Sequence, residues 1–237
     1  MLLKILSLLF FALMIYVNYL ANALPINGLS TGAVSNAYPN LFAPAGLTFS
    51  IWGIIYLLLA IVSIMFFFDS NKEILQKVSS FFIISSALNS LWIFAWHYQK
   101  FGLSVVIMLL LLAYLIIINH KLSSSPNSIF KAAFGIYLGW ICIATIANVT
   151  VWLVSLNWSG FGISQELWTS ILIAIGLGIT IAAVIKFNNP FLAASVIWAF
   201  IGIAIKQHGN SNLVFIAAIV GVVVILITVA SRQFYQP

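Results

Sequence analysis

Long apolar segments recur along the whole chain, and they restrict its fold more than any other feature. The chain has 237 residues, of which 64% are hydrophobic and only 5% are charged. A soluble domain carries about a quarter charged residues, so these residues cannot form a water-exposed surface around a core of this size. The sequence therefore predicts an all-α polytopic membrane protein. Nothing between the apolar segments is long enough for a soluble domain.

Eight segments are long and apolar enough, or nearly so, to cross about 30 Å of hydrocarbon as helices of about 20 residues. The seventh is the shortest, and helix-breaking residues bound it on both sides: Asn188-Asn189-Pro190 before it and Gln207-His208-Gly209-Asn210 after it. The predicted helices cover approximately residues 3–23, 45–68, 75–98, 101–120, 130–154, 166–186, 190–206 and 212–231.

The positively charged residues support eight helices and set their orientation. Seven of the nine lysines and arginines fall on one side of such a bundle, and only Lys100 and Lys206 fall on the other. Because cytoplasmic loops carry an excess of these residues, we expect both termini in the cytoplasm, at a bacterial-type plasma membrane. The cations form no basic run, so no nucleic-acid partner is expected. The cytoplasmic cations are Lys4, Lys72, Lys77, Lys121, Lys131, Lys186 and Arg232.

The first segment allows a second interpretation. Lys4, an apolar stretch to about Leu20, and then Ala21-Asn22-Ala23 resemble a signal peptide with a small-residue cleavage site. The stretch is long for the apolar region of a signal peptide, which favours an uncleaved first helix. Cleavage would instead leave seven helices and an external N-terminus.

One external loop is much longer than the others. Residues 24–44 read LPINGLSTGAVSNAYPNLFAP, with three prolines, two glycines and no lysine. A segment of this composition cannot form a packed core alone. We expect it to lie over the external mouth of the bundle and to contact the second and fifth helices.

The start of the second helix places aromatic rings on one face. Phe49, Trp52 and Tyr56 are three and four residues apart, which is the spacing of neighbours on a helix surface. Pro44 precedes the first turn, where its missing N–H is not needed. This segment is therefore expected to join the external loop to the wall of a pocket.

Two further helices carry a stripe of the same kind. In the third helix an asparagine and two tryptophans follow one face, and in the fifth helix residues four apart form a slowly slanting stripe with an alanine as its gap. The stripe residues are Asn89, Trp92 and Trp96 in the third helix, and Trp140, Ala144, Asn148 and Trp152 in the fifth.

The depth of these stripes predicts that they meet. At 1.5 Å per residue, Trp52, Asn89 and Asn148 all lie roughly 9–13 Å below the external ends of their helices. We expect them to share one cavity with Trp92 and Trp140 in the outer half of the bilayer. Two alternatives remain open: tryptophans can anchor a helix at the membrane interface, and a deep asparagine can hold helices together, worth about 0.6–2 kcal/mol.

The groups that catalysis or metal binding would need are missing from the predicted membrane interior. Glu166 lies near a helix start, Asp69 and Glu73 lie in a cytoplasmic loop, and Cys142 is the single cysteine. We therefore expect no catalytic residue, no metal site and no required cofactor. An aromatic, amide-lined apolar pocket suits a flat hydrophobic ligand that stacks on indole and accepts one or two hydrogen bonds.

The same residues resemble the TspO/MBR family, the translocator proteins or tryptophan-rich sensory proteins. The family's W-x-P-P, followed eight residues after its second proline by W-x-x-x-Y, is similar to Pro44, Trp52 and Tyr56. Three motifs in order on the expected helices make the resemblance specific over approximately residues 1–155. The other two, L-N-x-x-W and Y-L-x-W-x-x-x-A-T-x-x-N-x-x-x-W, match Leu88, Asn89 and Trp92, then Tyr137, Leu138, Trp140, Ala144, Thr145, Asn148 and Trp152.

The resemblance implies a five-helix bundle over residues 1–155, in which loop 24–44 closes a ligand pocket, followed by about three additional helices over residues 156–237. The five-helix members have no counterpart of these last helices. It also implies a homodimer in membrane lipid that binds a tetrapyrrole, such as protoporphyrin or haem, or a sterol-like or isoquinoline-like molecule. The expected ligand-binding residues are Pro44, Phe49, Trp52, Tyr56, Asn89, Trp92, Trp96, Trp140, Ala144 and Asn148.

The sequence departs from the family at positions that bear on activity. The loop tryptophan and first proline of W-x-P-P are Leu41 and Ala43 here, and the proline before the fifth-helix tyrosine is Ile136. The resemblance ties that tryptophan to porphyrin photochemistry in some members, so an enzyme of porphyrin breakdown is disfavoured. We interpret the chain as a sensor or carrier of a flat apolar ligand. The main alternative is a small-molecule transporter, which flux into sealed vesicles would distinguish.

Overall fold

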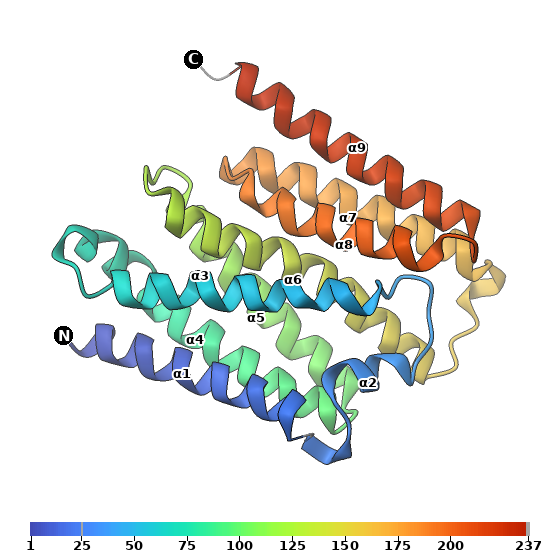
Figure 1. The fold of residues 1–237 in the computed structure, drawn as a ribbon, viewed down its shortest axis with the longest axis horizontal. Coiled ribbons are helices and arrows are strands. Elements are labelled where there is room, and N and C mark those ends of the chain that lie inside the picture. The colour runs from blue at the N-terminus through green and yellow to red at the C-terminus, as the bar shows by residue number, and fades with distance from the viewer. Residues whose placement is uncertain (25, 236–237) are drawn as a thin grey trace.

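The computed structural model of the chain describes residues 1–24 and 26–235, and in these residues all regular structure is helical. Eight long helices lie with their axes roughly aligned (Figure 1). They are α1 (Leu2–Ala23), α3 (Ile51–Met65), α4 (Lys72–His97), α5 (Phe101–Leu122), α6 (Ser128–Ser155), α7 (Gln165–Phe187), α8 (Phe191–Gln207) and α9 (Asn212–Tyr235). Short elements join them: η1 (Ile26–Gly28), α2 (Thr31–Asn36), η2 (Gly46–Ser50), η3 (Asp69–Asn71) and η4 (Gly160–Gly162).

The eight predicted segments correspond one to one with these long helices. The second starts as the 3-10 turn η2 and continues as α3, because Ala45 is extended and the chain coils only from Gly46 onward. The sequence did not predict α2, which has only six residues and begins at a serine cap. The hydroxyl of Ser30 accepts a hydrogen bond from the backbone N–H of Ala33 at 3.2 Å.

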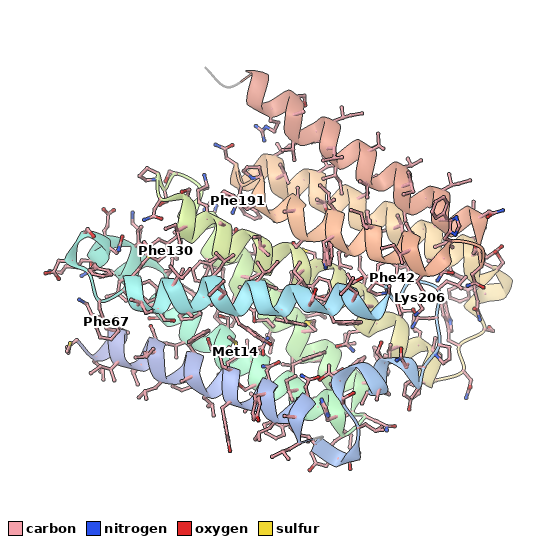
Figure 2. All side chains as sticks on the ribbon, in the orientation of Figure 1. Met14, Phe42, Phe67, Phe130, Phe191 and Lys206 are labelled. Carbon is pink, nitrogen blue, oxygen red and sulfur yellow. The ribbon has the colours of Figure 1, made fainter. Side chains whose placement is uncertain are left out.

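Seven of the described helices are long and apolar enough, by length and composition, to cross a membrane. The exception is α8, whose 17 residues span about 26 Å at 1.5 Å per residue, slightly less than the hydrocarbon core. Large apolar side chains such as Leu57, Leu110 and Ile227 are exposed along the outside of the bundle. Figure 2 shows mostly carbon along the flanks of the helices, as a surface in contact with lipid requires.

The helices form two groups that meet at α6. Helices α1, α3, α4, α5 and α6 make one bundle, and α7, α8 and α9 pack on its α6 side. The outermost helix is α9, which packs against α7 and α8. The start of α1 and the end of α9 lie at the same end of the molecule (Figure 1).

The contact between α6 and α8 is close because small residues face it. A β-carbon at Gly139 would overlap the backbone carbonyl of Leu192 and the hydroxyl of Ser195. Nearby, the Asn189 side-chain amide donates to the Lys131 carbonyl at 2.8 Å and to Oδ1 of Asn119 at 3.0 Å. Small residues and interhelical hydrogen bonds of this kind hold helices together in lipid, where the hydrophobic effect between them is lost.

Candidate functional site

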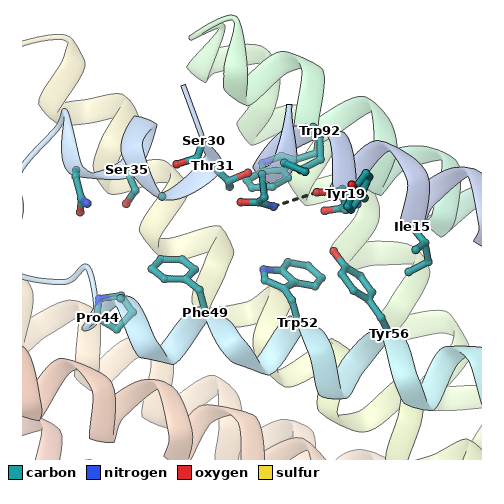
Figure 3. Close-up of a pocket in the computed structure, with 17 residues that line it drawn as sticks. Ile15, Tyr19, Ser30, Thr31, Ser35, Pro44, Phe49, Trp52, Tyr56 and Trp92 are labelled. Carbon is teal, nitrogen blue, oxygen red and sulfur yellow. Dashed lines mark hydrogen bonds between the residues drawn. The ribbon is translucent and has the colours of Figure 1, made fainter. Parts of the chain in front are cut away.

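The rings at the start of the second predicted helix face one space, as their spacing suggested. Phe49 comes from η2, and Trp52 and Tyr56 come from α3, with the last two stacked at 5.4 Å between ring centroids and 24° between planes. Figure 3 shows all three rings pointing across the space toward Thr31 of α2 and Trp92 of α4. This face of α3 therefore forms one wall of a cavity.

The opposite wall comes from α4, where a hydrogen bond fixes the orientation of an indole ring. Trp92 stacks on Trp96 with ring centroids 5.4 Å apart and planes inclined by 23°. The indole N–H of Trp92 donates to Oδ1 of Asn148 at 2.8 Å, and that of Trp96 donates to the carbonyl of Thr31 at 3.2 Å. An unpaired N–H at this depth would cost several kcal/mol, so both bonds restrict how the rings can turn.

The residues of the stripe on α6 form the inner wall of the cavity. Trp140 meets Trp52 edge-to-face at 6.1 Å and Phe49 at 6.0 Å. Its indole N–H is buried and has no hydrogen-bond partner among the described residues. The amide of Asn148 also donates to the hydroxyl of Ser104 on α5 at 2.8 Å, so this asparagine both joins helices and faces the cavity.

These walls enclose two connected spaces. The main cavity has a volume of about 740 Å³ and lies between α1, α2, η2, α3 and α4. The inner cavity, of about 60 Å³, continues from it toward α6 and is lined by Trp140, Ala144 and Asn148. Both spaces share Thr31, Ser35, Pro44, Phe49, Trp52 and Trp92.

Nine of the ten expected ligand-binding residues line one or both of these cavities, and Asn89 is the exception. Asn89 is 1% exposed, and its Oδ1 accepts from the Asn18 amide at 2.8 Å. Its own amide donates to the hydroxyl of Tyr137 at 3.0 Å. Asn89 therefore connects α1, α4 and α6 through hydrogen bonds, which is the role of a deep asparagine that holds helices together.

The sequence interpretation missed the contribution of α1 and α2. Asn18 and Asn22 from α1 line the main cavity, as do Thr31 and Ser35 from α2. Two asparagines four residues apart in a strongly apolar helix were a usable signal, because both lie on one face. The residues from α2 carried no such periodic signal, since that helix is short and lies in a polar loop.

The external loop covers the mouth of the bundle, but its hydrogen bonds go to α4 and α8 rather than to the second and fifth predicted helices. The hydroxyl of Thr31 lies 2.9 Å from Nε2 of His97, and the Asn27 amide donates to the carbonyl of His97 at 3.1 Å. At the other end of the loop, the Gln207 amide donates to the carbonyl of Leu41 at 3.0 Å. The loop faces α6 across two cavities, through Ser35 and Asn40 at the inner cavity and through residues 39–41 at a further cavity near the end of α6.

The last three helices hold the start of the second predicted helix in place. The backbone N–H of Ala45 donates to the carbonyl of Gly202 on α8 at 3.0 Å. The indole N–H of Trp198, also on α8, donates to the carbonyl of Thr48 at 2.8 Å. The wall that carries Phe49 and Trp52 is thus fixed by α8 as well as by α6.

The chemistry of the two cavities is neutral. Their walls contain rings, hydroxyls and amides, and none of their lining residues is charged. Among the described residues no group of three histidine, cysteine or acidic side chains could hold a metal ion. The arrangement can bind a molecule through stacking, apolar contact and a few hydrogen bonds.

Comparison with known proteins gives one match. A family model described as TSPO-like protein matches residues 4–231. This range includes α7, α8 and most of α9, so the match extends well beyond the 155 residues over which the motifs were recognised. No curated protein and no solved structure matches the chain.

Proposed function

The chain belongs to the TSPO-like protein family, and from this premise we propose that its two cavities bind a flat apolar ligand, such as a tetrapyrrole or a sterol-like molecule. The family and the apolar helices make it an integral, multi-pass membrane protein of a sensor or carrier kind. The observation that carries the ligand proposal is the pair of aromatic walls, Trp52 with Tyr56 and Trp92 with Trp96, on either side of the two neutral cavities, of which the main one has a volume of about 740 Å³.

The size and polarity of the cavities support this ligand class. Small-molecule sites usually have volumes of about 300–1,000 Å³, with mostly apolar walls and a few polar groups that fix orientation. Here the indole N–H of Trp140 is such a group, because it is buried beside the inner cavity and has no partner among the described residues. A ligand with a hydrogen-bond acceptor at that edge would satisfy it.

The outer loop favours binding over conversion of the ligand. Leu41 occupies the position of the loop tryptophan that the family resemblance ties to porphyrin photochemistry. No described carboxylate, histidine or cysteine lines the two cavities as a general acid, base or nucleophile. The proposed role is therefore that of a binding protein.

Titration of the purified protein with protoporphyrin IX, followed by quenching of tryptophan fluorescence, tests the proposal. Trp92→Ala should weaken binding by about 2- to 10-fold, since a stacked aromatic partner contributes about 0.5–1.5 kcal/mol beyond area burial. The fold should survive, because Oδ1 of Asn148 keeps the Ser104 hydroxyl as a donor at 3.2 Å. Phe94→Ala is the matched control on the same helix, where the ring is 42% exposed on the lipid side. Equal affinity of both variants would show that the stripe only packs helices.

We also propose that both termini face the cytoplasm of a bacterial-type plasma membrane. The proposal rests on the asymmetry of the cations and on the start of α1 and the end of α9, which lie at the same end of the molecule. A fluorescent protein fused after residue 237 should fold and fluoresce, whereas a C-terminal alkaline phosphatase should stay inactive. Phosphatase activity would contradict the cytoplasmic C-terminus and with it the eight crossings.

A further inference from the structure

A second apolar cavity lies outside the pocket described above, where the two groups of helices meet the external loop. This outer cavity has a volume of about 430 Å³ and is bounded by the end of α6, η4, the start of α7 and loop residues 39–41. Its walls include Leu153, Leu172 and two tryptophans, Trp158 and Trp168, whose ring centroids are 5.1 Å apart. None of these four side chains lines the main or inner cavity, whereas Asn40 lines both the outer and the inner cavity.

A polar cavity adjoins this apolar one. It has a volume of about 240 Å³ and shares Pro39, Asn40, Leu41 and Gln165 with the outer cavity. Its remaining wall includes the amides of Asn36, Gln207 and Asn210, and it contains one charged side chain, Lys206, at the end of α8. Figure 2 shows Lys206 toward the end of the molecule where the external loop lies.

The charge of Lys206 is not neutralised by any residue that the structure describes. The two ion pairs among the described residues are Lys4–Asp69 and Lys77–Glu73, which involve other helices. The third acidic residue of the chain, Glu166, accepts a hydrogen bond from the hydroxyl of Ser211 at 2.8 Å and forms no ion pair with Lys206 in the described residues. A cation among amide groups favours an anionic group in the same space.

We propose that the outer cavity and its polar neighbour form one binding site for an anionic amphiphile. The carboxylate or phosphate head lies against Lys206 and the amide of Gln165, and the apolar body lies against Trp158, Trp168 and Leu172. Gln165 and the loop residues belong to both spaces, so a head and tail in one molecule can occupy both at once. The polar cavity borders the main cavity at Ser35 and Asn36, but Lys206, Trp158 and Trp168 line neither the main nor the inner cavity.

The site also gives Trp158 and Trp168 a function other than anchoring a helix at the membrane interface. The indole N–H of Trp168 donates to the carbonyl of Gly160 at 2.7 Å, which fixes the ring at the start of α7. Trp158 packs against it and against Phe161 with ring centroids 5.3 Å apart. The two indoles thus form a pre-arranged apolar wall, which reduces the ordering that binding requires.

A brominated chain tests the site because bromine quenches only tryptophans that it contacts closely. The protein in an uncharged detergent is titrated with 12-bromododecanoate and, separately, with 12-bromododecanol, which has the same chain without the charge. We expect the carboxylate to reach half-maximal quenching at a concentration about 5- to 10-fold lower, as one charge-assisted contact provides. Trp158→Phe should reduce the amplitude of this charge-dependent quenching, whereas Trp92→Phe should leave it unchanged.

Charge variants decide the role of the lysine. Lys206→Gln should abolish the preference for the carboxylate and Lys206→Arg should retain it. Lys100→Gln, which removes the other external cation, is the matched control and should behave as the unmodified protein. The proposal is overturned if the carboxylate and the alcohol quench equally in the unmodified protein, or if Lys100→Gln has the same effect as Lys206→Gln.

A comparison of two bilayers distinguishes whether the anionic head belongs to a membrane lipid or to a free amphiphile. In nanodiscs of phosphatidylglycerol, a lipid occupant would compete with 12-bromododecanoate and raise its half-quenching concentration relative to nanodiscs of phosphatidylcholine. An unchanged concentration assigns the site to a free amphiphile instead. Either result is compatible with the proposed site. The proposal is overturned if 12-bromododecanoate and 12-bromododecanol quench equally in nanodiscs of phosphatidylcholine.

Discussion

Gly139→Ala is expected to destabilise the protein strongly, although it adds a single methyl group. A β-carbon at this position would overlap the backbone carbonyl of Leu192, which cannot move away as a flexible side chain could. The two helices would have to separate, and overpacking of this kind typically costs about 1–3 kcal/mol, occasionally more. The midpoint of unfolding in sodium dodecyl sulfate should fall clearly below that of the unmodified protein.

A second glycine provides the matched control for this experiment. Gly178 lies in α7, and a β-carbon there would have no atom within 4 Å. Gly178→Ala should therefore be neutral or stabilise the protein by up to about 1 kcal/mol, because alanine is the better helix former. If Gly139→Ala is as stable as Gly178→Ala, α6 and α8 do not pack closely enough at Gly139 to exclude a β-carbon.

The Gly139→Ala substitution should also weaken ligand binding. The N–H of Ala45 and the carbonyl of Thr48 bond to α8, so a displaced α8 releases the start of the wall that carries Phe49 and Trp52. Protoporphyrin affinity of Gly139→Ala should thus fall even at temperatures where the variant remains folded. This coupling gives the last three helices a concrete role in the proposed site.

Ala144→Leu is the second change with a large expected effect, and it acts on binding rather than on stability. The inner cavity of about 60 Å³ holds about the volume of two liquid waters, and the three additional carbons of leucine would fill it. We expect the affinity for protoporphyrin IX to fall at least about tenfold, which corresponds to about 1.4 kcal/mol. The same fluorescence titration used for Trp92→Ala measures it.

The control for this prediction places the same side chain on the outside of the bundle. Ala182 is exposed on α7, so Ala182→Leu should leave both affinity and unfolding midpoint unchanged. The unfolding midpoint of Ala144→Leu should also stay close to that of the unmodified protein, since the leucine enters an existing space. Unchanged affinity in Ala144→Leu would mean that the ligand does not reach the inner cavity.

The local features of the fold were predictable from the sequence because their causes are local. Apolar length gave the eight helices, and Asn188-Asn189-Pro190 marked the boundary between α7 and α8. Helical periodicity placed Phe49, Trp52 and Tyr56 on one face, which Figure 3 shows, and depth along the helices predicted that Trp52 lies level with Asn148. Each of these inferences needs only the rise and turn of a single helix.

The groups that each helix face contacts in the folded bundle were not predictable from single helices. Asn89 has the same spacing from Trp92 as any stripe residue, but it bonds to Asn18 and Tyr137 instead of facing the cavity. The loop was expected against the second and fifth helices, and it faces the fifth, α6, across two cavities, but its hydrogen bonds go to α4 and α8. The spacing of residues along one helix face does not specify which of them face a cavity and which face a neighbouring helix.

The sequence by itself determined which segments form long apolar helices and which side chains share a face, because both follow from the composition and period of one helix. Only the tertiary structure decided that α8 supports the pocket wall, that α1 lines the cavity and that Lys206 lines a polar cavity beside it. In lipid the hydrophobic effect does not draw one apolar helix toward another. Their arrangement instead depends on close fits such as that between Gly139 and Leu192, and such a fit exists only once both surfaces are in place.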